Sequence, residues 1–144
     1  MKNTFKWLML LILVVHFTVQ AYAKVDEQRE VRAVIHNYIN GTSNGEPELI
    51  KKAFHERASL LLSHPNKAFW QVSAEDYASW FESAKGQRAG AILSVTIDGD
   101  IAMARALITT ASPVKQYIDQ FLLKRFPKGW QMVIYRQLSM SKVP

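Results

Sequence analysis

His55 is the first residue whose type and position could support chemistry. It follows Phe54 at the end of a short helical pattern and precedes an apolar run that begins at Ala58. An imidazole titrates near neutral pH, so His55 could act as a general base or as a hydrogen-bond donor at the mouth of a pocket. The alternative is that its ring caps the helix end by bonding to backbone carbonyl groups.

Asp119 is the second candidate, because it lies within the apolar strand pattern of residues 115–125. Strand alternation places it on the same side as Phe121 and Leu123, which favours a buried or interface location. Burial would raise the pKa of the carboxyl group and would suit it to proton transfer in a pocket. The alternative is a surface acid that pairs with a lysine or an arginine.

Arg105 shares a predicted strand face with Ile101, Met103 and Leu107. A lone arginine on an apolar face often pairs with an acid or binds an anionic ligand. Asp119, one strand away, is the candidate acid. A structural ion pair is therefore the alternative to a contact with a ligand.

A set of aromatic side chains could line a pocket for a flat apolar molecule, together with His55 and Arg105. Pockets for such molecules are mostly apolar and carry few polar groups. The aromatic candidates are Tyr38, Trp70, Tyr77, Trp80, Phe81, Phe121 and Trp130. The alternative is that they form an ordinary hydrophobic core. The spacing of the histidines indicates no metal site, and no motif indicates a bound cofactor.

Two helices are predicted at the start of the globular part. Residues 25–40 repeat apolar side chains at helical spacing, and Gly41 is the predicted stop. Residues 42–45 then form a turn. Pro47 suits the first turn of a second, short helix, which is predicted to end near His55.

A third helix is predicted to begin after Ser73. Its hydroxyl group can cap the helix, and an acid follows three positions later. Tyr77, Trp80 and Phe81 recur at helical spacing and predict an aromatic stripe on one face. Gly86 is the predicted end.

The remaining sequence predicts strands, most of them in an antiparallel meander. The dipeptide Asp98-Gly99 is a strong hairpin signal. The predicted strands are residues 58–63, 69–72, 91–97, 101–111, 115–125 and 130–138. Helices that are segregated from antiparallel strands indicate an α+β domain, with the sheet curled around the helices.

The first 23 residues have the pattern of a secretory signal peptide. Two lysines precede an apolar run over residues 7–19, and residues 21–23 read Ala-Tyr-Ala, a cleavage pattern. The run is shorter than the roughly 20 residues that a spanning helix needs. We therefore expect cleavage after Ala23 and an exported domain, periplasmic or secreted, over residues 24–144, without stable membrane insertion. An uncleaved N-terminal anchor is the alternative.

The composition excludes several classes of site. Eighteen basic and 12 acidic residues give a formal net charge of +6, and these charges are spread along the chain. This pattern indicates a solvated surface rather than a nucleic-acid site. The absence of cysteine excludes disulfides, thiolate metal sites and lipid attachment at the cleavage site.

Several short segments resemble the nuclear transport factor 2-like superfamily, and within it the lumazine-binding branch. The matching segments are residues 38–41, 49–58, 73–77, 97–102, 117–119, 122–124 and 129–130. The resemblance rests on the order of these segments along residues 25–137. It implies a cone-shaped (cystatin-like) α+β fold with three N-terminal helices packed on a curved antiparallel sheet. It also implies a pocket for a small apolar or aromatic molecule and homodimers formed through the sheet.

The chain departs from the family pattern near its last strand. A lysine commonly stands where this chain has Tyr135, and Phe126-Pro127-Lys128-Gly129 replaces an acidic-glycine turn. The leading hypothesis is an exported small-molecule-binding protein. Two alternatives remain open: a small isomerase- or dehydratase-type enzyme that uses His55 with Asp119, and a non-catalytic structural or interaction domain whose cone is filled by its own side chains.

Overall fold

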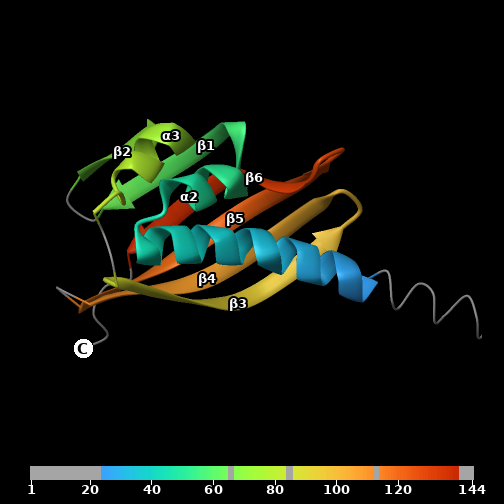
Figure 1. The fold of residues 1–144 in the computed structure, drawn as a ribbon, viewed down its shortest axis with the longest axis horizontal. Coiled ribbons are helices and arrows are strands. Elements are labelled where there is room, and N and C mark those ends of the chain that lie inside the picture. Colours follow the sequence, from blue (N-terminus) through green and yellow to red (C-terminus); the bar gives the residue numbers. More distant parts are fainter. Residues whose placement is uncertain (1–23, 65–66, 84–85, 112–113, 140–144) are drawn as a thin grey trace, which may run out of the picture.

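A long N-terminal helix lies along one face of a curved sheet (Figure 1). The computed structural model describes residues 24–64, 67–83, 86–111 and 114–139. The predicted signal peptide, residues 1–23, lies outside these ranges.

Three helices and six strands make up the described part of the chain. The N-terminal helix covers residues 24–44. The later elements are α2 (Pro47–Ala53), β1 (Phe54–His64), β2 (Lys67–Val72), α3 (Ala74–Ser79), β3 (Arg88–Asp98), β4 (Ile101–Ala111), β5 (Val114–Phe126) and β6 (Gly129–Ser139). The predicted hairpin at Asp98-Gly99 is confirmed as the β3–β4 turn, and the predicted four-strand meander is confirmed as β3–β6.

The six strands form one sheet in the order β2-β1-β6-β5-β4-β3. Four of the five neighbouring pairs are antiparallel, whereas β1 and β6 run parallel. The predicted α+β class with a curved sheet is confirmed. The parallel pair adds a feature that local sequence patterns do not encode, because its strands are joined through all the intervening elements.

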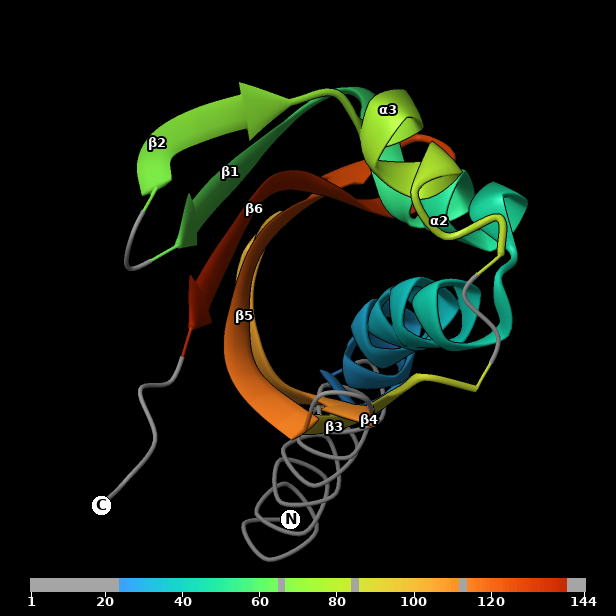
Figure 2. The ribbon, with the colours of Figure 1, turned by 90° about the vertical axis from the view of Figure 1, so that its left-hand side faces the viewer.

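The sheet curls around the N-terminal helix, as Figure 2 shows in the view along the helix. The helix buries Ile35 and Tyr38 completely. On β4, the alternating alanines Ala102, Ala104 and Ala106 are buried, and the larger side chains point to the other face. Small side chains on the inner face let the helix approach the sheet closely, so the alanine face of β4 faces the core.

The predicted stop of the N-terminal helix at Gly41 is wrong. The helix continues to residue 44, and the turn is made by Gly45, whose φ of 70° suits glycine. Gly41 has a different role. A Cβ atom at this position would lie 2.6 Å from Cγ1 of Ile50 in α2. Glycine therefore stands there because α2 packs directly against the helix backbone.

The predicted aromatic stripe on α3 is wrong at Trp80. The Ser73 cap is confirmed, since its hydroxyl oxygen accepts from the backbone N–H of Asp76 over 3.0 Å. The helix, however, ends at Ser79 rather than near Gly86, and Trp80 donates its backbone N–H to the residue three positions earlier. This tighter turn leaves Trp80 53% exposed while Phe81 is buried.

Candidate functional site

Three tyrosines and one aspartate meet at the centre of the fold; we call them the tyrosine–aspartate cluster. The hydroxyl group of Tyr38 donates a 2.7 Å hydrogen bond to Oδ2 of Asp119. The hydroxyl oxygen of Tyr38 also lies 3.1 Å from those of Tyr77 and Tyr135, which are 3.3 Å from each other. The four side chains come from the N-terminal helix, α3, β5 and β6. The cluster therefore joins the helices to the sheet.

Burial raises the pKa of Asp119 to about 6. Hydrogen bonding from Tyr38 and the positive charge of Arg88 act in the opposite direction and limit this rise. Burial also raises the pKa values of Tyr38 and Tyr135 well above the usual range, which keeps both as neutral hydroxyl groups. Asp119 is therefore the member of the cluster that changes charge near neutral pH.

Arg88, at the start of β3, supplies the positive charge beside this cluster. Its guanidinium carbon lies 4.9 Å from the ring centroid of Phe81. Within the described ranges, Nε and Nη2 of Arg88 and Oδ1 of Asp119 are buried and make no hydrogen bond of ordinary geometry. The two charges act on each other through space rather than through a direct ion pair.

The cluster closes the centre of the cone. Its four side chains are at most 2% exposed. The rings of Phe54 and Phe121 pack edge-on against Tyr38, with centroids 5.9 Å and 5.3 Å away. The chain's own side chains thus fill the centre of the fold.

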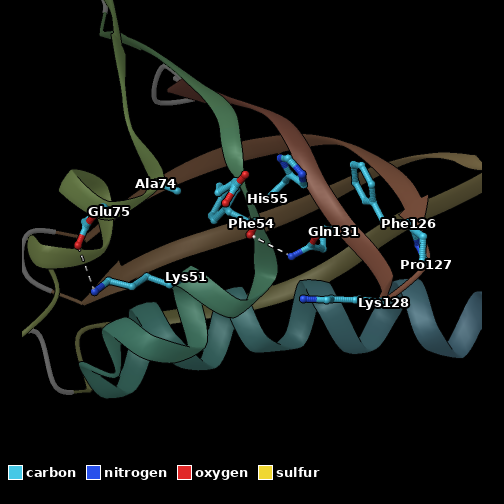
Figure 3. A pocket seen from close by; sticks show the side chains of 10 residues that line it. Lys51, Phe54, His55, Ala74, Glu75, Phe126, Pro127, Lys128 and Gln131 are labelled. Carbon is cyan, nitrogen blue, oxygen red and sulfur yellow. Dashed lines mark hydrogen bonds and ion pairs between the residues drawn. The ribbon is translucent and has the colours of Figure 1, made fainter.

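An open groove of about 620 Å³ lies between the α2–β1 junction, α3 and the β5–β6 hairpin (Figure 3). We call it the hairpin groove. Its lining residues are Lys51, Phe54, His55, Glu56, Ala74, Glu75, Phe126, Pro127, Lys128 and Gln131. The volume lies within the range of small-molecule sites in proteins.

A stacked pair of rings provides the flat surface of this groove. The centroids of His55 and Phe126 are 4.6 Å apart, and the ring planes are inclined by 18°. Nδ1 of His55 accepts the backbone N–H of Arg57 over 3.1 Å. In the neutral ring, Nε2 then carries the hydrogen atom and can donate to a ligand. His55 is thus fixed by a strand backbone group and does not cap α2.

Charged and amide groups surround this flat surface. Lys51 lies 3.7 Å from Glu75 across the groove end, and Gln131 donates to the carbonyl oxygen of Phe54 over 3.4 Å. Lys128 extends from the hairpin toward the groove (Figure 3), and it forms no ion pair within the described residues. The rim therefore offers both hydrogen-bond donors and acceptors.

The structure does not bring the two predicted catalytic residues to one cavity. His55 lines the hairpin groove, whereas Asp119 lies in the buried cluster and does not line the groove. Phe54 stands between them, because it lines the groove and its ring also packs against Tyr38. The expected burial of Asp119 is confirmed.

The predicted ion pair of Arg105 with Asp119 is wrong. Arg105 lies opposite Gln120 in the β4–β5 ladder, whereas Asp119 lies opposite Ala106. Adjacent positions on a strand point to opposite faces, so Arg105 projects from the outer face and Asp119 from the inner face. The exposed state of Arg105 and the full burial of Asp119 agree with this.

None of the seven predicted aromatic residues lines the hairpin groove in the described structure. Trp70 and Trp80 are 36% and 53% exposed. The other five are buried in the core: Tyr38, Tyr77, Phe81, Phe121 and Trp130. These aromatic side chains are therefore mainly part of the core, which was the alternative interpretation.

Sequence reasoning did not select Arg88, Phe126, Lys128, Gln131 or Tyr135 as site residues. A signal existed for three of them. Tyr135 replaces a lysine of the family pattern and completes the cluster, and Phe126 and Lys128 belong to the altered turn and line the groove. Arg88 follows a glycine-containing loop, and its sequence context carries no comparable signal.

The described residues contain no group of three or more histidine, aspartate or glutamate side chains placed to hold a metal ion. In the same part of the chain, no helix is both long and apolar enough to cross a membrane.

Solved structures with this fold come from several bacteria. A nuclear transport factor 2-like protein of unknown function from Shewanella baltica OS155 superposes with a TM-score of 0.73 at 17% identity, covering 82% of this chain and 97% of that one. A similar protein from Methylobacillus flagellatus KT gives 0.72 at 24%, covering 81% and 94%. A third, with a cystatin-like fold, comes from Novosphingobium aromaticivorans and gives 0.67 at 17%, covering 87% and 89%. At these identities the likeness shows the fold.

The sequence comparison is more specific. A search of curated proteins finds no significant match. The sequence profile of the family described as "Putative lumazine-binding" matches residues 26–135, which is most of the chain and includes the tyrosine–aspartate cluster and the hairpin groove. The chain therefore belongs to this family of the nuclear transport factor 2-like superfamily.

Proposed function

We propose that this protein is an exported small-molecule-binding protein whose ligand occupies the hairpin groove. Family membership supports the binding of a small molecule. The main support for placing the ligand there is the stacked pair of His55 and Phe126 in a groove of about 620 Å³. Aromatic rings prefer offset-stacked or edge-on neighbours, so this pair offers a surface for a further flat ring.

The family description names lumazine, a planar bicyclic ring with carbonyl and N–H groups along its edge. The groove presents matching groups beside its flat surface: the Nε2–H of His55, the amide of Gln131 and the ammonium group of Lys128 can donate to carbonyl groups. The carboxylates of Glu56 and Glu75 can accept from ring N–H groups.

The interior of the cone is the other possible location. Tyr38, Tyr77 and Tyr135 fill it and satisfy one another's hydroxyl groups. A ligand there would have to break this packing, which costs free energy before any contact is gained. The groove needs no such rearrangement, and this supports it as the site.

Fluorescence titration with lumazine tests the proposal. Phe126→Ala removes half of the stacked pair, and we expect the dissociation constant to rise about tenfold. His55→Ala should weaken binding by a similar factor, because it removes the other ring and the Nε2–H donor. Trp80→Ala is the matched control, since it removes an exposed aromatic ring that does not line the groove. Unchanged affinity in both groove variants would place the ligand elsewhere.

Export and dimer formation are part of the proposal. The pattern of residues 1–23 supports export, and Phe69, which is 64% exposed on the edge strand β2, offers an apolar contact for a second copy. Native mass spectrometry of protein recovered from the periplasm, expressed with its own leader, tests both. We expect a dimer of chains that begin at residue 24. An intact leader or a monomer at micromolar concentration would contradict the respective part.

A second candidate function is proton transfer at the tyrosine–aspartate cluster. The pKa of Asp119, about 6, favours it, because such a carboxyl group can take up and release a proton near neutral pH. Tyr38, whose hydroxyl group donates a 2.7 Å hydrogen bond to Asp119, would be its partner rather than His55. The activity requires a substrate that displaces part of the closed cluster. Solvent deuterium incorporation into simple ketones tests this activity, which Asp119→Asn should abolish. Incorporation at the uncatalysed rate would exclude it for those substrates.

A further inference from the structure

A second groove, of about 480 Å³, lies on the outer face of the sheet, away from the N-terminal helix. We call it the outer-face groove. Its lining residues are Leu61, Ser94, Thr96, Met103, Ala104, Arg105, Gln120, Phe121, Leu122, Ile134 and Arg136. Neither His55 nor any other residue of the hairpin groove belongs to it.

One row of this groove is polar. Ser94, Arg105, Gln120 and Arg136 occupy directly paired positions on the neighbouring strands β3, β4, β5 and β6. Neighbouring strands are about 4.8 Å apart, so the two arginines start about 10 Å from each other with Gln120 between them. Their long side chains can therefore converge above Gln120.

The adjacent row of the same face is mainly apolar. Thr96, Met103, Leu122 and Ile134 are also directly paired across the four strands, two positions along from the polar row. Two residues of a strand span about 7 Å. Met103 is 59% exposed and Ile134 is 40% exposed. An apolar strip therefore runs parallel to the arginine row. The spacing between the two rows is comparable to the length of a small molecule, so one ligand can contact both.

The charge of the groove is one-sided. Its lining contains two arginines and no acidic residue. Neither Arg105 nor Arg136 forms an ion pair with another described residue. Guanidinium groups match carboxylate geometry with two parallel hydrogen bonds, and two of them on one face favour an anion strongly over a cation.

We propose that the outer-face groove binds a small carboxylate with a compact apolar body. The carboxylate lies above Gln120, between Arg105 and Arg136, and accepts from the two guanidinium groups and the amide. The apolar body covers Met103, Leu122 and Ile134. This site is separate from the hairpin groove and does not depend on the function proposed for it.

A second copy of this chain is the competing occupant of the same face. A two-fold dimer centred on the groove would bring Arg105 and Arg136 of both copies together, with no acidic lining residue to neutralise them. Like charges in contact oppose such an arrangement. A dimer contact centred on Phe69 of β2 would avoid this repulsion and leave the groove open.

Calorimetric titration with 2-naphthoate tests the proposal, and naphthalen-2-ylmethylammonium serves as a probe of the same ring system with the opposite charge. We expect naphthoate to bind and the ammonium probe to bind at least tenfold more weakly. Amide NMR spectra recorded in parallel should show the side-chain signal of Gln120 shifting with naphthoate.

Four variants test the location of the site. Arg105→Gln and Arg136→Gln should each raise the dissociation constant of naphthoate about tenfold, because each removes one charged donor. Arg32→Gln, at an exposed arginine of the N-terminal helix, is the matched control and should leave it unchanged. His55→Ala should also leave it unchanged.

Three results would overturn the proposal. Equal binding of the two probes would show that the arginines do not select an anion. A loss of naphthoate binding in His55→Ala, with none in the arginine variants, would place the carboxylate in the hairpin groove. A dimer that dissociates on Arg105→Gln and binds no naphthoate would identify the face as an interface between copies.

Discussion

Tyr38 and Asp119 are 81 positions apart in the sequence, and the hydroxyl group of the first donates a 2.7 Å hydrogen bond to the carboxyl group of the second. The bond links the N-terminal helix to β5 in the centre of the sheet. Because both side chains are fully buried, no water replaces this bond when it is lost.

Tyr38→Phe should therefore destabilise the protein by about 1–3 kcal/mol, since it leaves Oδ2 of Asp119 without its donor. The hydrogen bond favours the ionised carboxylate and lowers its pKa, so the loss should be larger at about pH 8 than at about pH 5. Urea unfolding at both pH values measures this. Tyr77→Phe removes only contacts between hydroxyl groups, so an equal pH dependence in both variants would argue against the assigned bond.

Asp119→Asn should change how stability depends on pH. The pKa of Asp119 is about 6 in the folded protein, compared with an ordinary value of 3.8. The folded state therefore holds this proton more tightly than the unfolded state. The stabilising contribution is complete below about pH 4 and is lost as the pH rises through 6. From below pH 4 to well above pH 6, the free energy of unfolding of the variant should therefore rise by about 3 kcal/mol relative to that of the natural protein.

Asp100→Asn is the matched control for this experiment. The hydrogen bond from Lys124 lowers the pKa of the exposed Asp100 carboxyl group. Its contribution is therefore present above the ordinary pKa and is lost as the pH falls, which is the opposite sign. Urea midpoints recorded from about pH 2 to about pH 7 compare the two, because the Asp100 contribution is lost only below about pH 4. Stability differences with the same slope in both variants would refute the assignment for Asp119.

Phe81 and Trp80 are neighbours with opposite surroundings. Phe81→Ala should cost about 3–5 kcal/mol, because the ring is buried and packs against Tyr77 and Arg88. Trp80→Ala should cost less than about 1 kcal/mol, because half of the side chain already faces solvent. Thermal unfolding followed by circular dichroism gives both values. A larger loss for Trp80 would restore the single aromatic stripe expected from helical spacing.

Gly41→Ala should destabilise the protein even though alanine is the better helix former. The new Cβ atom would lie 2.6 Å from Cγ1 of Ile50 and 3.0 Å from two backbone atoms, and overpacking of this kind costs about 1–3 kcal/mol. Asn40→Ala, at an exposed position of the same helix, should be neutral or stabilising. Guanidinium unfolding of the two variants decides the point, and a stabilised Gly41→Ala protein would contradict the close packing.

Most of the fold could be predicted from local patterns. The alternation in residues 101–111 and the Asp98-Gly99 turn are properties of neighbouring residues, so they predict β3 and β4 directly. The parallel pairing of β1 with β6 could not be predicted in this way, because it depends on how distant elements pack. Gly41 was mistaken for a helix end because its reason, the contact with Ile50, lies outside the helix.

The candidate sites were less predictable than the fold. His55 is a candidate because of its chemistry, and it does line a groove. Its stacking partner Phe126 lies 71 positions away in an altered turn, and nothing in the local sequence shows that this turn packs against His55. Asp119 was placed correctly in the interior by alternation. Its partners Tyr38 and Tyr135 lie 81 and 16 positions away on other elements, and no pairwise spacing in the sequence marks that contact.

The central place of β6 also determines when the chain can fold during synthesis. The strand lies between β1 and β5 in the sheet. One hydrogen-bonding edge of β1, the strand that carries the buried Leu60 and Leu62, therefore has no partner until residues 129–139 have left the ribosome. Before that point the β1–β2 hairpin and the β3–β5 meander are two separate pieces of sheet. Their union into one sheet therefore depends on the last strand of the domain.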